Sequence, residues 1–143
     1  MQNLWVIFVG GMLPAFFWGV TAIFQKQSSV TVGPGLYLLV FGSAVAAFGL
    51  VWTLVVKPSV TVAGVGYAAL AGVTFAAGTG LISFALYAYS APLSRLAPIW
   101  SANVLVTLAI AVILLGEGAG LNLYKIFGGT ALIIAGVLLV TSA

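Results

Sequence analysis

Side chains able to bind a small molecule recur at helical spacing along this chain of 143 residues. Hydroxyl, amide and aromatic groups that lie three, four or seven positions apart share one face of an α-helix. Such a face can line a cavity, where hydroxyl and amide groups supply hydrogen bonds and aromatic rings supply contact area. The candidate binding residues are Trp18, Thr21, Thr79, Ser83, Tyr87, Trp100, Asn103 and Thr107.

Each of these positions also has a structural explanation. Trp18 is equally suited to packing against a neighbouring helix, and the hydroxyls of Thr79 and Ser83 can return hydrogen bonds to their own helix. Asn103 lies close to the centre of an apolar run, where a buried amide needs partners. It either lines a ligand cavity or bonds to a neighbouring helix, an interaction worth about 0.6 to 2 kcal/mol. The sequence leaves both explanations open.

The composition excludes most catalytic chemistry. The chain has no cysteine, no histidine and a single acidic residue, Glu117. It therefore offers no thiolate nucleophile, no imidazole metal site and no carboxylate within an apolar run for proton exchange. No nucleophile with its base and no set of metal ligands can be assembled, so we expect no enzyme, no metal and no cofactor. Glu117 is expected to pair with Lys125 or with a cation of another copy, for about 0 to 1 kcal/mol.

Charged residues separate long apolar runs. Hydrophobic residues make up 64% of the chain and charged residues 3%, a composition that cannot cover a water-soluble surface. A Lys or Arg at the centre of a membrane span costs about 2.5 to 3.5 kcal/mol, so the charges mark membrane edges. The runs cover residues 4–24, 36–56, 63–89, 92–115 and 123–140. A span needs roughly 20 residues. We therefore expect one all-α membrane domain over 1–143, with five transmembrane helices and an uncleaved first helix.

The cations favour neither orientation in the membrane. Five crossings place Lys57 and Lys125 on one side and Lys26 and Arg95 on the other, whereas a fixed orientation requires more cations on the cytoplasmic side. The sequence therefore favours insertion both ways, although so few cations can also balance by accident. Two oppositely oriented copies would pair as an inverted repeat of ten helices, a framework in which transporters alternate access. Cations this far apart form no patch for nucleic acid.

Three segments resemble a known family. Residues 93–117 read LSRLAPIWSANVLVTLAIAVILLGE, residues 118–140 read GAGLNLYKIFGGTALIIAGVLLV, and the first run ends FFWGVTAIFQK. The A-P opening of the fourth helix, its closing G-E and the Gly-rich fifth helix resemble the EamA-type domain of the drug/metabolite transporter superfamily. The likeness extends over essentially the whole chain, because the family unit is itself five helices. Most members fuse two such units, and this chain has the length of one.

Together with the charge balance, the resemblance implies a small-metabolite transporter in the inner membrane of a prokaryote. It would work by alternating access as an antiparallel homodimer. Pro14 and Pro98 are candidate hinges, because proline bends a helix, and the 25–35 loop is a candidate gate. The small multidrug exporters of this superfamily carry a glutamate in their first helix, and this chain has none there. The rival interpretation is a non-transporting accessory subunit that pairs with another five-helix chain.

The polarity of the expected cavity restricts which small molecules it can bind. A neutral, aromatic and lightly polar lining suits small amphipathic metabolites, including zwitterions and cations held over aromatic faces. The sequence does not select among them, nor does it select a direction or a coupling ion. Gln25 shares a face with Trp18 and Thr21 but lies near a membrane edge, where it is suited to facing headgroups. The aromatic residues of the second run, Tyr37, Phe41, Phe48 and Trp52, suit lipid as well as a cavity.

Overall fold

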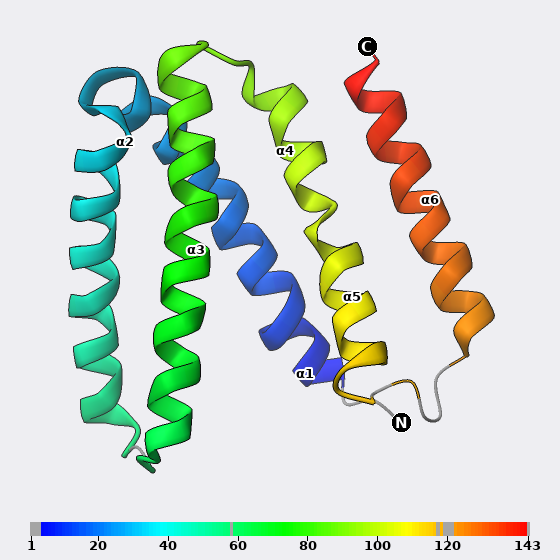
Figure 1. The fold of residues 1–143 in the computed structure, drawn as a ribbon, viewed down its shortest axis with the longest axis horizontal. Coiled ribbons are helices and arrows are strands. Elements are labelled where there is room, and N and C mark those ends of the chain that lie inside the picture. Colours follow the sequence, from blue (N-terminus) through cyan, green and yellow to red (C-terminus); the bar gives the residue numbers. More distant parts are fainter. Residues whose placement is uncertain (1–3, 58, 117, 119–121, 143) are drawn as a thin grey trace. The chain divides into compact units, whose positions relative to one another are not determined.

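The computed structural model describes residues 4–57, 59–116, 118 and 122–142, and every regular element among them is a helix (Figure 1). The elements are α1 (Leu4–Ile7), the π-helix η1 (Phe8–Met12), α2 (Leu13–Val55), α3 (Val62–Ala88), α4 (Leu93–Ser101), α5 (Asn103–Ile113) and α6 (Leu123–Thr141). The all-α prediction is thereby confirmed for the described residues. The helices group into two compact units, an N-terminal unit, Met1–Ala91, and a C-terminal unit, Pro92–Ala143.

Four helical stretches are long and apolar enough to cross a membrane. They are Leu4–Val55, Val62–Ala88, Leu93–Ile113 and Tyr124–Thr141. Large apolar side chains are exposed along all four, and the only buried hydrophobic residues in the described part of the chain are Tyr37 and Leu86. In water this exposure would be prohibitive, whereas in a bilayer lipid tails cover apolar surface and the helices satisfy their own backbone groups. The chain is a multi-pass membrane protein.

A sharp reversal at Gly33 divides α2 into two arms. Gly33 has φ 73° and ψ 164°, a combination that only glycine adopts readily. The following Pro34 has no N–H to continue the helical hydrogen bonds across the reversal. The first arm, residues 4–32, comprises α1, η1 and the start of α2, and the second arm, residues 34–55, runs back in the opposite direction (Figure 1).

The predicted flexible loop over 25–35 is therefore wrong. Residues 25–32 are helical, and Gly33 alone departs from helical angles. A helix satisfies its backbone hydrogen bonds internally, and helical structure here extends up to the reversal itself. The Ser28-Ser29 pair is typical of a turn in water, but here it lies within the last turns of the first arm.

The π-helix accommodates Pro14 without ending the first arm. A proline ring clashes with the carbonyl four residues earlier and has no N–H to bond to it. Just ahead of Pro14, the Leu13 N–H donates to the Phe8 carbonyl, five residues back, which widens the turn. Met12 and Leu13 keep helical angles. Pro14 thus lies in a widened but continuous helix, and its hinge role stays a prediction.

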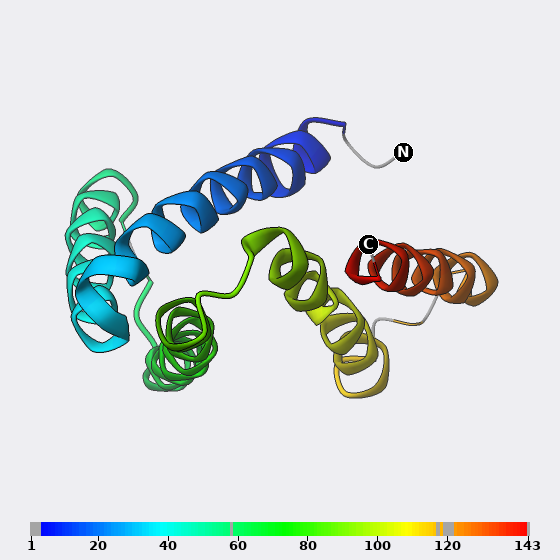
Figure 2. The ribbon, with the colours of Figure 1, turned by 90° about the horizontal axis from the view of Figure 1, so that it is seen from above.

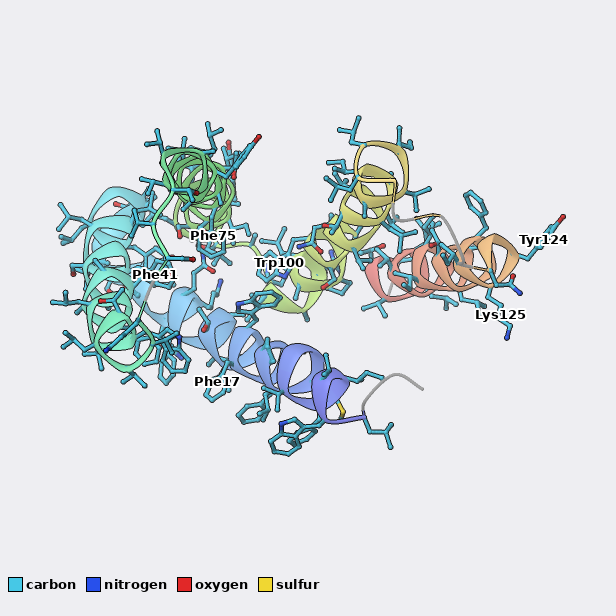
Figure 3. All side chains as sticks on the ribbon, turned by 90° about the horizontal axis from the view of Figure 1, so that it is seen from below. Phe17, Phe41, Phe75, Trp100, Tyr124 and Lys125 are labelled. Atoms are coloured by element: carbon cyan, nitrogen blue, oxygen red, sulfur yellow. The ribbon has the colours of Figure 1, made fainter. Side chains whose placement is uncertain are left out.

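The second arm packs against α3, whereas the N-terminal part of the first arm diverges from both (Figures 1 and 2). Phe41 of the second arm stacks on Phe75 of α3 with ring centroids 6.0 Å apart, and Figure 3 shows the two rings between these helices. A Cβ on Gly80 would lie 3.0 Å from Leu38 Cδ1, so glycine permits this close approach.

In the C-terminal unit, α4 packs against α6. The predicted fourth helix, 92–115, is interrupted at Ala102, whose N–H donates to the Ile99 carbonyl three residues back at 3.1 Å. Next to it, the Ser101 hydroxyl donates to the Ala97 carbonyl at 2.8 Å, a side-chain bond that competes with the helical ladder and bends helices. Pro98 lies within α4, one turn before this interruption. Glu117 lies outside the described residues.

Candidate functional site

Most of the buried residues described in the N-terminal unit are polar. Its buried polar side chains form a cluster that we call the polar cluster: Gln25 and Ser29 of the first arm, with Thr79 and Ser83 of α3. The Gln25 Nε2 donates to the Thr79 carbonyl at 3.2 Å and to the Ser83 hydroxyl at 2.9 Å. One amide thus joins the first arm to α3. In lipid, where apolar surfaces do not attract each other through water, such bonds help hold helices together.

The polar cluster changes the interpretation of three residues. Thr79 and Ser83 are candidate binding residues in the sequence, and the structure brings them together as the partners of Gln25. Gln25 itself does not face headgroups, because its side chain is only 6% exposed and turns towards α3. Gln25 lies near the end of an apolar run, which is why the sequence suggested that it faces lipid headgroups. The helix, however, continues past Gln25 to Val32.

Ser29 is an exception within this cluster. Its hydroxyl oxygen is buried and has no hydrogen-bond partner in the described part of the chain. A buried polar group without a partner costs about 1 to 3 kcal/mol. We expect Ser29→Ala to keep or raise the free energy of unfolding, by up to about 1 kcal/mol, and Ser83→Ala to lower it by about 1 kcal/mol. Unfolding in mixed micelles by added dodecyl sulfate, followed by circular dichroism, measures both. Equal losses in the two variants would show that Ser29 has a partner.

Lys26 and Lys57 lie at opposite ends of the N-terminal unit. The Lys26 Nζ donates to the Ala91 carbonyl at 2.8 Å, just beyond the C-terminal end of α3. Helix C-terminal ends attract cations, because their last carbonyls carry a partial negative charge. Lys57 follows Val55, the last residue of the second arm, at the far end from the reversal. The two cations are therefore separated by the length of the second arm.

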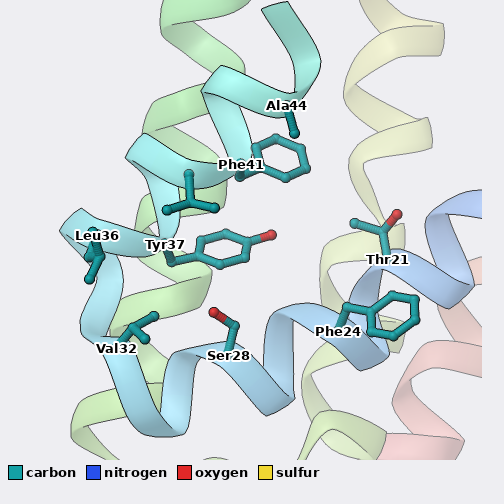
Figure 4. A pocket seen from close by; sticks show the side chains of 9 residues that line it. Thr21, Phe24, Ser28, Val32, Leu36, Tyr37, Phe41 and Ala44 are labelled. Atoms are coloured by element: carbon teal, nitrogen blue, oxygen red, sulfur yellow. The ribbon is translucent and has the colours of Figure 1, made fainter. Parts of the chain in front are cut away.

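A cleft of about 410 Å³ lies between the two arms of α2 (Figure 4). It is lined by Thr21, Phe24, Ser28 and Val32 from the first arm and by Leu36, Tyr37, Val40, Phe41 and Ala44 from the second. Most of this lining is apolar, and its side-chain polar groups are the hydroxyls of Thr21, Ser28 and Tyr37. In Figure 4 the Tyr37 hydroxyl points across the cleft in the direction of Thr21.

The structure distributes the other candidates of the N-terminal unit differently. Thr21 lines the cleft. Trp18 is 69% exposed and lines neither the cleft nor the polar cluster. The Tyr87 ring is half-exposed and lies 3.9 Å from the point where a Cβ on Gly33 would stand, so it packs beside the reversal. These candidates therefore occupy separate places rather than one cavity.

The candidates of the C-terminal unit lie on both sides of the interruption at Ala102. Trp100 is half-buried at the end of α4, whereas Asn103 begins α5 and Thr107 follows one turn later. Asn103 and Thr107 are exposed and four residues apart on the same helix, so they keep a common face. The binding role of these three residues stays a prediction.

Sequence reasoning missed Ser28 and Tyr37 as cleft residues. Thr21 and Ser28 are seven positions apart, which places them on one face once the first arm is known to continue beyond Phe24. The serine pair before Gly33 and Pro34 concealed that continuation. Tyr37 and Phe41 turn towards the cleft and α3, whereas Phe48 and Trp52 of the same helix stack on each other and stay exposed.

Comparison of the chain with protein-family models, with curated proteins and with solved structures gives no match. Its own residues and their geometry are therefore the basis for assigning a function.

Proposed function

We propose that this chain is a single EamA-type unit of the drug/metabolite transporter superfamily, and that it carries small metabolites across the inner membrane of a prokaryote. Two copies in opposite orientation form the transporter and alternate access by rocking against each other. Each copy contributes five crossings: the first arm, the second arm, α3, α4 with α5, and α6. The balance of cations between the two membrane faces supports this proposal most directly.

The geometry of the N-terminal unit is consistent with that balance. The reversal at Gly33 makes two crossings out of one continuous apolar stretch, and α3 makes a third. Lys26 bonds next to the end of α3, and Lys57 lies at the far end of the second arm. These two cations therefore fall on opposite faces, as an evenly charged chain requires.

Transport is favoured over a purely structural role by the cleft and the polar cluster. Both place polar groups on apolar helices, where an unpaired polar group is costly and usually serves a function. The cleft lies directly beside the reversal of α2, between two helical arms that run in opposite directions. A scaffold would gain nothing from a cleft between two of its helices.

Dual orientation predicts a specific labelling pattern. The chain has no cysteine, so Ser59→Cys, in the segment before α3, and Ser94→Cys, in the first turn of α4 after it, can each be labelled without background. We expect a membrane-impermeant thiol reagent to reach about half of each cysteine in intact cells and the rest after permeabilisation. Each single variant is the control for the other. If one variant labels fully from outside and the other not at all, the chain has one fixed orientation.

Flux through liposomes that contain only the purified chain separates the transporter from an accessory subunit. We expect uptake of at least one class of small metabolite, with cross-links between oppositely oriented copies in the same preparation. Absence of flux for every class tested, together with flux after adding a second five-helix chain, would identify an accessory subunit instead.

A further inference from the structure

We infer that the cleft between the two arms of α2 binds the transported molecule, and that this molecule is uncharged. It combines an apolar body with one group that both donates and accepts hydrogen bonds, such as a hydroxyl or a primary amide. This inference rests on the proposed function and narrows it to one site and one chemical class. The juxtaposed hydroxyls of Thr21, Ser28 and Tyr37 within an apolar lining are its basis.

Tyr37 provides a fixed hydrogen-bonding group. Its side chain is only 7% exposed, and its ring stacks on Phe41 with centroids 5.6 Å apart. Phe41 stacks in turn on Phe75 of α3, which holds the phenol in place. The Tyr37 hydroxyl has no hydrogen-bond partner within the described part of the chain, and it points into the cleft (Figure 4). The ring of Tyr37 is therefore buried while its hydroxyl is open to the cleft, where it is available to a ligand.

Ser28 and Thr21 complete the polar side of the cleft. The Thr21 hydroxyl donates to the Phe17 carbonyl at 2.9 Å, so it is left with the capacity to accept from a ligand. The Ser28 hydroxyl, like that of Tyr37, has no partner among the described residues and can donate or accept. The cleft therefore offers two free hydrogen-bond donors and several acceptors. These match a ligand group that both donates and accepts hydrogen bonds.

The uncharged lining of the cleft disfavours an ionic ligand. None of the residues that line it carries a charge. Lys26, on the first arm, directs its amine to the Ala91 carbonyl. An uncompensated charge in apolar surroundings costs several kcal/mol, which hydroxyls offset only in part. The zwitterions and cations that the sequence admits are therefore disfavoured.

The volume of the cleft fits a small molecule. Ligand pockets are usually about 300 to 1,000 Å³, and this cleft holds about 410 Å³. A hydrocarbon chain of a lipid would contact the apolar lining, yet it would leave the free hydroxyls of Ser28 and Tyr37 without partners. An amphipathic molecule satisfies both the apolar lining and these hydroxyls.

Photolabelling of the full-length chain in phospholipid liposomes tests this inference. The probe is an eight-carbon alcohol with a diazirine on its chain, compared with the matching hydrocarbon and the matching trimethylammonium compound. We expect the alcohol alone to label cleft residues saturably, with competition by octanol. Tyr37→Phe keeps the ring and should raise the concentration for half-saturation about three- to tenfold, as loss of one hydrogen bond predicts. Ser28→Ala should have a similar effect.

Tyr124→Phe is the matched control, because Tyr124 is an exposed tyrosine on α6 and should not matter (Figure 3). Equal saturable labelling by hydrocarbon and alcohol, unchanged in Tyr37→Phe, would make the cleft a lipid contact and overturn the inference. Saturable labelling by the trimethylammonium probe would overturn the assignment of a neutral ligand. Flux of the alcohol is measured in the same liposomes as the excess over protein-free liposomes, because the alcohol also diffuses through the bilayer unaided. Saturable labelling without such excess flux refutes transport and keeps the site, whereas saturable excess flux without labelling of the cleft refutes the site alone.

Discussion

Gly33→Ala should lower the free energy of unfolding by about 1 to 3 kcal/mol, the strain expected when a residue with a Cβ is held in a backbone region that is essentially restricted to glycine. At φ 73° and ψ 164°, Gly33 makes the whole reversal of α2 by itself. The added methyl group meets only the Tyr87 ring, at an ordinary contact distance of 3.9 Å, so the penalty comes from the backbone rather than from crowding.

Gly35→Ala is the matched control for this prediction. Gly35 lies two residues later, in the second arm, and a Cβ there would meet nothing within 4 Å. Alanine favours a helix over glycine by about 0.5 to 1 kcal/mol, so this variant should be as stable as the native chain or more so. Dodecyl sulfate unfolding followed by circular dichroism compares the two variants. Equal stabilities would mean that the reversal does not depend on the glycine at 33.

Gln25→Leu should lower the free energy of unfolding by about 1 to 2 kcal/mol. The change keeps the approximate size of the side chain but removes both hydrogen bonds from the first arm to α3. Measured interhelical hydrogen bonds in membranes contribute about 0.6 kcal/mol on average and up to about 1.7 kcal/mol. The Gln25 amide makes two of them from one buried position, and the Ser83 hydroxyl would lose a partner.

Gln27→Leu provides the comparison, because Gln27 is exposed on the same arm and bonds to nothing among the described residues. In lipid the leucine should be neutral or slightly stabilising there. A double-mutant cycle between Gln25→Leu and Ser83→Ala should give a coupling energy of about 0.5 to 1.5 kcal/mol, the range of one hydrogen bond. Additive effects in this cycle would contradict a direct bond between the two side chains.

Helix positions in this chain are largely predictable from local sequence. The ends of α3 and α6 lie within one residue of the apolar runs 63–89 and 123–140. A membrane helix is a local property, because its backbone bonds are internal and lipid accepts apolar side chains on every face. The same uniformity explains what is not predictable, since a helix that is apolar all round has no hydrophobic stripe to show which side faces its neighbours.

The turn signals in the chain were the least informative part of the sequence. Ser28, Ser29, Gly33 and Pro34 together are typical of a long loop, yet only Gly33 leaves helical geometry. The interruption at Ala102 follows no glycine, and its sequence signals are a proline one turn earlier and the serine just before it. In both places a single residue interrupts the helix, so almost all backbone groups keep their internal hydrogen bonds.

The sequence by itself determined that this chain is an all-helical membrane protein and that its cations alternate between the ends of its apolar runs. The reason is that the free energy of placing a residue in lipid depends mainly on the polarity of that residue alone. Only the tertiary structure decided that Gln25 is buried against Thr79 and Ser83, and that Tyr37 and Ser28 face one cleft while Trp18 lies outside it. Whether a polar group is satisfied depends on partners that are close in space and far apart in sequence, and a reversal at a single glycine brought those partners within reach.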